Sequence, residues 1–233
     1  MTSHLVGLSY DAHDPARLAQ FWAGVLRREL AADGVTLLPN EDNGFELRFR
    51  PTEAAKTYPN QMHFDLTSKS LEDQQDIVAR ALELGGRHLD IGQGPDEPHI
   101  VLADPEGNEF CVIEPTNNFL ANTGAIGALS SDGSQAVGYF WSEALGWPLV
   151  WDQDEETAIQ SANGGSKISW GGPPFREKTA KNRLRLDLSA DGDQQAEVDR
   201  LISLGAKRIG DTAGETSWID LVDPDGNEFS LHK

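Results

Sequence analysis

The sequence contains very little cysteine and no long hydrophobic run. Cys111 is the only cysteine among 233 residues, so the chain cannot form an internal disulfide, which fits a reducing compartment. No apolar run approaches the roughly 20 residues that span a bilayer. The first residues also lack the basic segment and apolar stretch of a secretory leader. We therefore expect a cytoplasmic protein with no membrane partner.

Positive charge is also scarce. The chain has 19 Lys and Arg residues against 38 Asp and Glu residues, a formal net charge of −19 at pH 7. Such a surface repels phosphate backbones, so we expect no nucleic-acid partner. Hydrophobic residues make up 38% of the chain, enough for a globular core, and the length suits one large domain or two small ones.

The sequence contains an internal repeat of about half its length. Residues 104–110 read DPEGNEF and residues 223–229 read DPDGNEF, a spacing of 223 − 104 = 119. The Phe-Trp pair at 21–22 returns at 140–141 with the same spacing. Two further matches follow the same order: Leu-Gly at 84–85 and 204–205, and the strands at 63–66 and 185–188. Four such landmarks in one order predict a tandem duplication rather than two unrelated domains that share a turn. The polar, aperiodic stretch after the first copy is typical of a linker, which predicts domains at 1–116 and 124–233 joined by 117–123.

Each copy is expected to be mixed α and β. In the first copy, residues 5–10 form a predicted strand, and Asp14 and Pro15 are suited to begin a helix. A second strand begins at Met62 and is followed by a helix from Ser70 to Leu84. Further short strands follow each helix. A unit of this kind covers one sheet face with its helix, and two such units side by side can curl their bare faces into a cup.

The sequence resembles the vicinal oxygen chelate superfamily, which includes glyoxalase I, extradiol dioxygenases, and fosfomycin- and bleomycin-resistance proteins. The resemblance rests on the Asp-x-x-Arg-x-x-x-Phe-Trp helix from Asp14, on the His63-x-Asp-Leu strand, and on the Asp-Pro-x-Gly-Asn-x-Phe turn near each domain end. It covers nearly the whole chain. It implies an α+β fold of two tandem glyoxalase-like domains, each made of paired βαβββ modules that form a half-barrel cup.

The resemblance also implies a divalent metal at the floor of the first cup. His4 and His63 stand where relatives have metal-binding histidines, but Cys111 replaces the third ligand, a glutamate. A His-His-Cys set favours zinc over iron, which prefers a carboxylate. Glu46 or Asp65 could supply a carboxylate or transfer a proton as the catalytic residue. The alternative is that Cys111 fills the core and the histidines bind no metal.

The second copy has no metal set, because the corresponding positions are Thr123, Arg185 and Ser230. We expect no metal there. Arg185 could bind an anionic ligand through its guanidinium fork, or it could pair with a nearby acid. Three tryptophans without a counterpart in the first copy could line an apolar pocket for a flat ligand, or pack in the core: Trp151, Trp170 and Trp218.

Two functions of different classes are favoured, and a third stays open. One is a metal-dependent lyase, isomerase or dioxygenase acting on a small organic molecule in the first domain. The other is a metal-free protein that binds or sequesters a small molecule, as bleomycin-resistance proteins do. A purely structural or regulatory module is a third. The two domains are expected to pair within a monomer, or the chain to form a homodimer.

Overall fold

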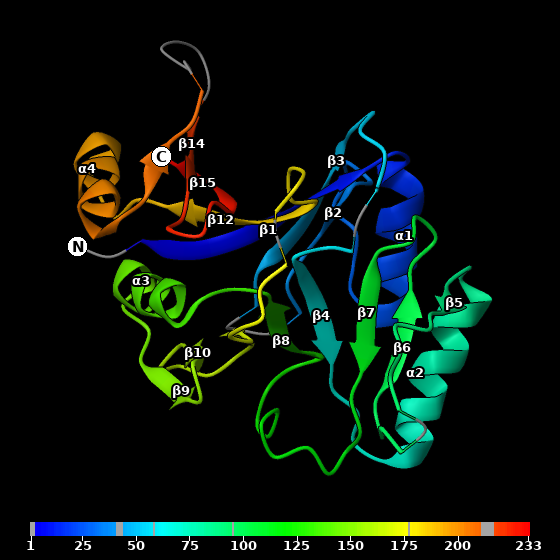
Figure 1. Cartoon of the computed structure of the whole chain (residues 1–233). Helices are drawn as coiled ribbons and strands as arrows, with labels where there is room; N and C mark the ends of the chain where they lie inside the picture. Colours follow the sequence, from blue (N-terminus) through cyan, green and yellow to red (C-terminus); the bar gives the residue numbers. More distant parts are fainter. Residues whose placement is uncertain (1–2, 41–43, 58, 95, 177, 211–216) are drawn as a thin grey trace.

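The computed structural model describes residues 3–40, 44–57, 59–94, 96–176, 178–210 and 217–233. The described part of the chain forms two mixed sheets and four helices (Figure 1). The α+β class is therefore confirmed. None of the helices in the described ranges is both long and apolar enough to cross a membrane.

The first sheet, sheet A, has seven strands. Its strand order is β13 (Lys207–Arg208), β14 (Trp218–Val222), β15 (Glu228–His232), β12 (Leu184–Ser189), β1 (His4–Ala12), β3 (Glu46–Pro51) and β2 (Thr36–Leu37). At its centre β1 and β12 run antiparallel, with Leu8 opposite Leu186. Figure 1 shows β1 in blue alongside β12 in yellow-orange, although the two strands are far apart in the sequence.

The second sheet, sheet B, has eight strands. Its strand order is β5 (Arg87–His88), β6 (Ile100–Ala103), β7 (Glu109–Val112), β4 (Met62–Leu66), β8 (Ile126–Ser131), β11 (Lys167–Trp170), β10 (Glu156–Gln160) and β9 (Leu149–Gln153). At its centre β4 and β8 run antiparallel, with His63 opposite Ser130. Each sheet therefore joins one module of the first repeat to one module of the second.

The helices begin where their capping residues predict. They are α1 (Pro15–Leu26), α2 (Leu71–Glu83), α3 (Gln135–Leu145) and α4 (Gln194–Leu204). The Asp14 carboxylate accepts a hydrogen bond from the backbone N–H of Arg17, and the Ser70 hydroxyl accepts one from that of Asp73. Figure 1 shows α1 and α2 together on one side of the molecule, and α3 and α4 together on the other.

The core of the first repeat lies between its two modules. Trp22, on α1, is fully buried, and its ring centroid lies 5.0 Å from those of Phe64 on β4 and Phe110 on β7. Trp141 makes the same contact with Phe229 in the second repeat, also at 5.0 Å. The helix-covered faces of the two modules thus pack together, which leaves the other face of each sheet without a helix.

The repeated turn and the repeated tryptophan are one structural unit. The Asp104 carboxylate accepts hydrogen bonds from the backbone N–H groups of Glu106 and Asn108, both at 2.9 Å, and from the Trp22 indole at 3.3 Å. Asp223 accepts the equivalent bond from the Trp141 indole at 3.1 Å. The turn motif and the Phe-Trp motif recur together because the aspartate of the turn binds the tryptophan of the helix. Their role is to position the sheets rather than to form a ligand site.

Candidate functional site

The faces of sheets A and B that carry no helix are called cup A and cup B. Side chains alternate along each strand, so residues two apart face the same side. On β4, Phe64 and Leu66 are buried in the core, whereas His63 and Asp65 face cup B. Asp65 is level with Cys111 on the neighbouring strand β7. The register of the sheet therefore brings three metal-ligand residue types to one place in cup B.

His63, Asp65 and Cys111 form a compact group, called the cup B triad. One ligand atom from each residue lies within 4.8 Å of the others. His63 Nε2 is 3.3 Å from Asp65 Oδ1. The side chains of His63 and Asp65 keep 32% and 15% of their surface exposed, while Cys111 is buried. The triad is thus partly sheltered but open on one side.

The titration behaviour of the triad follows from its contacts. Burial lowers the pKa of His63, but the interactions with Asp65 and Cys111 outweigh it and raise the pKa to about 10. Burial raises the pKa of the Cys111 thiol, although His63 opposes this. Without a bound cation, His63 is therefore an imidazolium and Cys111 a neutral thiol at neutral pH.

Two serines orient the aspartate of the triad. The Ser130 hydroxyl donates a hydrogen bond to Asp65 Oδ2, and the Ser169 hydroxyl donates to Ser130 at 3.2 Å. Both serines face cup B from β8 and β11, the strands that the second repeat contributes. Asp65 Oδ1 is thus directed at His63 while Oδ2 is held, which is how outer hydrogen bonds orient metal-ligating carboxylates.

The donor set of the triad fits a zinc ion. Imidazole, carboxylate and thiolate are all zinc ligands, with bonds of about 2.0–2.3 Å that place ligand atoms roughly 3.3–3.8 Å apart. The separation of 3.3 Å between His63 Nε2 and Asp65 Oδ1 already matches this spacing. Three protein ligands leave one tetrahedral position free. The triad can therefore hold a divalent metal and still bind one further ligand.

The segment that joins the repeats crosses part of cup B. The Phe119 ring lies 6.4 Å from that of Trp151 on β9 and 4.5 Å from Lys167 Nζ on β11. Lys167 also donates a hydrogen bond to the carbonyl of Phe119. Leu120, the next residue, is buried. The linker thus closes the β9 side of the cup, four strands away from β4. A cavity of about 640 Å³ between the linker and α2 does not reach the triad.

Comparison with known proteins identifies the fold. A family model described as the glyoxalase-like domain matches the chain twice, over residues 7–113 and 128–232. The chain belongs to this glyoxalase-like family. The resemblance to the vicinal oxygen chelate superfamily, and the two tandem glyoxalase-like domains with their cups, are thereby confirmed.

Solved structures share the fold of this glyoxalase-like chain at low sequence identity. Glyoxalase I from Zea mays is 15% identical with a TM-score of 0.67, and the match covers 100% of this chain and 92% of that one. A putative dioxygenase from Bacillus subtilis subsp. subtilis str. 168 is 15% identical with a TM-score of 0.64, covering 98% and 84% of the two chains. None of the curated proteins matches the chain.

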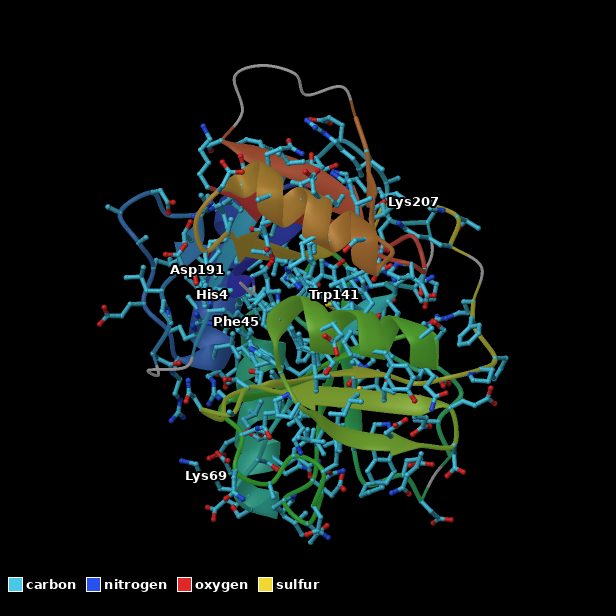
Figure 2. The ribbon with its side chains drawn as sticks, turned by 90° about the vertical axis from the view of Figure 1, so that its left-hand side faces the viewer. His4, Phe45, Lys69, Trp141, Asp191 and Lys207 are labelled. Carbon is cyan, nitrogen blue, oxygen red and sulfur yellow. The ribbon has the colours of Figure 1, made fainter. Side chains whose placement is uncertain are left out.

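The structure does not bring His4 to the triad. His4 begins β1 in sheet A, with 60% of its side chain exposed and its Nε2 4.0 Å from Asp191 Oδ2. Figure 2 shows His4 beside Asp191, well away from Lys69, which follows β4. The set His4, His63 and Cys111 therefore does not assemble, because β1 and β4 belong to different sheets in this glyoxalase-like chain. Asp65, rather than His4, lies beside His63 and Cys111.

Glu46 and Arg185, the other charged candidates, both lie in sheet A. Glu46 is on β3 and pairs with Arg48 at 3.1 Å, so it is on a different sheet from Asp65. Arg185 is buried on β12, and its Nη1 donates to Asp11 Oδ2 at 2.8 Å. The ion-pair alternative for Arg185 is thus the arrangement that the structure contains.

The three candidate tryptophans lie in three different environments. Trp151 is 39% exposed at the edge of cup B, and Trp218 lies on β14 in sheet A beside Arg50. Trp170 is 1% exposed and packs in the core, where a ligand cannot reach it. The inward position of Trp170 follows from the alternation of side chains along β11. Lys167 and Ser169 face the cup, so Ile168 and Trp170 face the core.

Sequence reasoning missed Ser130 and Ser169, which act from the second repeat on a site in the first. The internal repeat contains a signal that could have pointed to these serines. Ser9 donates to Asp187 Oδ2 at 2.5 Å in sheet A, as Ser130 donates to Asp65 in sheet B. The equivalence of these pairs becomes visible only when β1 is known to pair with β12, and β8 with β4.

Proposed function

We propose that cup B is a zinc centre that binds a small organic molecule through its oxygen atoms. His63 Nε2, Asp65 Oδ1 and the Cys111 thiolate would hold the metal. The observation that carries the proposal is the convergence of these three ligand atoms within 4.8 Å, with one side open to solvent. Zinc is favoured over iron because a thiolate stands where a non-haem iron site uses its second histidine, and thiolate is a common zinc ligand.

The chain's own residues prepare this site in three ways. Ser130, supported by Ser169, fixes Asp65 so that one oxygen faces the metal position. His63 and Cys111 would release their protons when the ion enters, because only the neutral imidazole and the thiolate are ligands. Trp151 and Phe119 supply an apolar wall at the far edge of the cup. When bound, zinc polarises carbonyl or hydroxyl oxygens as a Lewis acid.

The reaction class favoured by this site is a glyoxalase-like lyase or isomerase rather than a dioxygenase. Zinc has no redox chemistry, so proton transfer and carbonyl polarisation are the reactions it supports. Glyoxalase I from Zea mays, which shares the fold at 15% identity, is by its name an enzyme of this class.

A metal-free binding protein is the second candidate. The contact that favours it is the one between His63 and Asp65 at 3.3 Å, which satisfies both groups without a cation. In that case the imidazolium and the aspartate would serve as polar anchors for a sequestered molecule.

Metal content distinguishes the two candidates. We would equilibrate the metal-stripped protein with zinc by dialysis and measure bound zinc by mass spectrometry. We expect one zinc per chain in the wild type, and loss of zinc in His63→Ala and in Cys111→Ala. His4→Ala is the matched control, because His4 lies on the other sheet, and this variant should keep its zinc.

Two results would contradict the zinc proposal. A correctly folded wild-type protein that retains no zinc would remove the enzyme proposal and leave the metal-free binder. Loss of zinc in His4→Ala, with retention in His63→Ala, would move the metal to the other sheet and contradict the triad.

A further inference from the structure

Cup A contains a polar cluster with missing hydrogen-bond partners. Arg50 on β3, Asp187 on β12 and His232 on β15 each have a buried side-chain atom that accepts or donates no hydrogen bond within the described chain. These atoms are Arg50 Nε, Asp187 Oδ1 and His232 Nε2. Asp187 is the most enclosed of the three residues, with 5% of its side chain exposed. Three such atoms in one place are uncommon in folded proteins.

The contacts among the three residues are ion-pair contacts rather than hydrogen bonds. Asp187 Oδ1 is 3.7 Å from His232 Nε2, and Asp187 Oδ2 is 3.8 Å from Arg50 Nη2. Both distances exceed the range of a hydrogen bond between nitrogen and oxygen. The charges of Arg50, Asp187 and His232 therefore partly offset one another. The buried atoms Nε, Oδ1 and Nε2 can still form hydrogen bonds with a ligand.

A cavity lies against two of the three residues, and Arg50 stands behind them through its contact with Asp187. It has a volume of about 320 Å³, and Asp187 and His232 are both part of its lining, together with Arg48, Glu46, Ser189 and Gly7. Gly7 lies close to the neighbouring strand, since a Cβ there would stand 3.2 Å from the carbonyl oxygen of Glu46. The volume is at the lower end of the range for small-molecule sites.

The geometry of the cluster indicates the chemistry of its ligand. Nε and Nη2 form the edge of a guanidinium that binds a carboxylate through two parallel hydrogen bonds, and on Arg50 this edge has no such partner. Asp187 Oδ1 requires a donor, which a hydroxyl or amine supplies. Trp218 braces Arg50, whose guanidinium carbon lies 5.3 Å from the ring centroid.

Cup A differs from cup B at the positions that would hold a metal. Asp187 matches Asp65, and each accepts a hydrogen bond from a serine of the partner repeat. However, Arg185 stands where cup B has His63, and Ser230 stands where it has Cys111. A guanidinium in place of an imidazole supplies positive charge without a metal ligand.

We propose that cup A is a metal-free site for a small organic acid that carries a hydroxyl or amine next to its carboxylate. Arg50 binds the carboxylate, and Asp187, with His232 beside it, accepts from the neighbouring donor. This site is independent of zinc in cup B, so either proposal can fail alone.

Mandelate is a suitable probe, because it combines a carboxylate, an adjacent hydroxyl and a ring. Binding to the full chain would be followed through the Trp218 indole N–H signal in ¹H–¹⁵N spectra, assigned with Trp218→Phe. Phenylacetate lacks the hydroxyl and mandelamide lacks the charge. We expect both to bind roughly tenfold more weakly than mandelate or worse, the loss that one charge-assisted or buried hydrogen bond predicts.

The variants test the assignment residue by residue. Arg50→Lys keeps the charge but loses the two-point edge, and Asp187→Asn removes the charged acceptor; each should weaken mandelate binding about tenfold or more. Arg50→Lys alone decides if Asp187→Asn does not fold. His63→Gln, in cup B, is the matched control and should bind mandelate as the wild type does. Absence of any Trp218 shift with mandelate, or unchanged binding in Arg50→Lys, would overturn the proposal.

Discussion

Asp65 shows how one side chain acquires its role from both repeats. Its own strand places it beside His63, and strand β7 of the same repeat places it level with Cys111. The serine that holds its second oxygen comes from the other repeat. A carboxylate with one oxygen fixed and one directed at an imidazole is prepared for a cation or for a polar ligand.

The raised pKa of His63 predicts a pH-dependent stability for the metal-free protein. Its folded-state pKa is about 10 against about 6.5 in an unfolded chain. The folded state therefore binds the proton more tightly, so the stabilisation is complete below pH 6.5 and is lost as the pH rises towards 10.

Urea unfolding in the presence of a chelator would measure this effect. We expect the free energy of unfolding of the wild type to fall between pH 6.5 and pH 10 by more than that of His63→Gln. His99→Gln is the control, because the ion pair of His99 is with the half-exposed Glu97, at 3.7 Å. Parallel pH profiles for wild type and His63→Gln would contradict the assigned pKa.

At the scale of single residues, the sequence predicted a site with His4, His63, Asp65 and Cys111, and the structure brings the last three together but not His4. His4 was placed by the resemblance to relatives with a metal-binding histidine at that position, which assumes that the first strand and the second module share a cup. Which strands pair across the two repeats is a long-range property, and no local sequence pattern predicts it. His232 and Asp187 were overlooked as site residues for the same reason, since they meet Arg50 only across β1 and β12.

At the scale of elements, local patterns predicted the first strand and the first two helices. The strand expected at 5–10 is β1, and the helices expected after Asp14 and Ser70 begin at Pro15 and Leu71. The capping residues and the apolar stripes determine these boundaries. The two-residue strands β5 and β13 were missed, because strands so short carry no periodicity and exist only by pairing with β6 and β14.

Helix α3 contains a close approach that predicts the cost of a single methyl group. A Cβ on Gly138 would stand 2.0 Å from Thr157 Oγ1 and 2.6 Å from Thr157 Cβ on β10. We expect Gly138→Ala to destabilise the protein by about 1–3 kcal/mol through overpacking, against a gain of about 1 kcal/mol in helix propensity.

Gly24→Ala in α1 is the matched control for this substitution. A Cβ there meets the tip of the Leu84 side chain at 2.5 Å, and Leu84 is exposed and able to move. We expect this variant to be neutral or slightly stabilised in thermal unfolding. If Gly138→Ala proved as stable as Gly24→Ala, the contact between α3 and β10 would not be as close as described.

At the scale of the whole molecule, each sheet is completed by strands of both repeats. β1 pairs with β12 and β4 pairs with β8, so neither repeat alone can satisfy the central edges of its strands. Exposed edges of this kind drive association. The linker only has to keep the repeats close, because the strand pairs supply the specificity.

This arrangement predicts the behaviour of the separated repeats. We expect residues 1–116, expressed alone, to dimerise or aggregate rather than to remain a folded monomer. Mixing with residues 124–233 should give a 1:1 complex with the circular dichroism of the intact chain. Light scattering after gel filtration would measure both states. A stable monomer of 1–116 would show that the crosswise pairing is not required for folding.

The crosswise pairing of β1 with β12 and of β4 with β8 has an evolutionary consequence. In an assembly of two identical subunits, any substitution changes both pockets at once. With the two copies fused, a substitution on β7 alters one pocket and leaves the other as it was. Selection can then retain a metal-binding chemistry in one basin and a purely organic recognition in the other, within a single inherited unit.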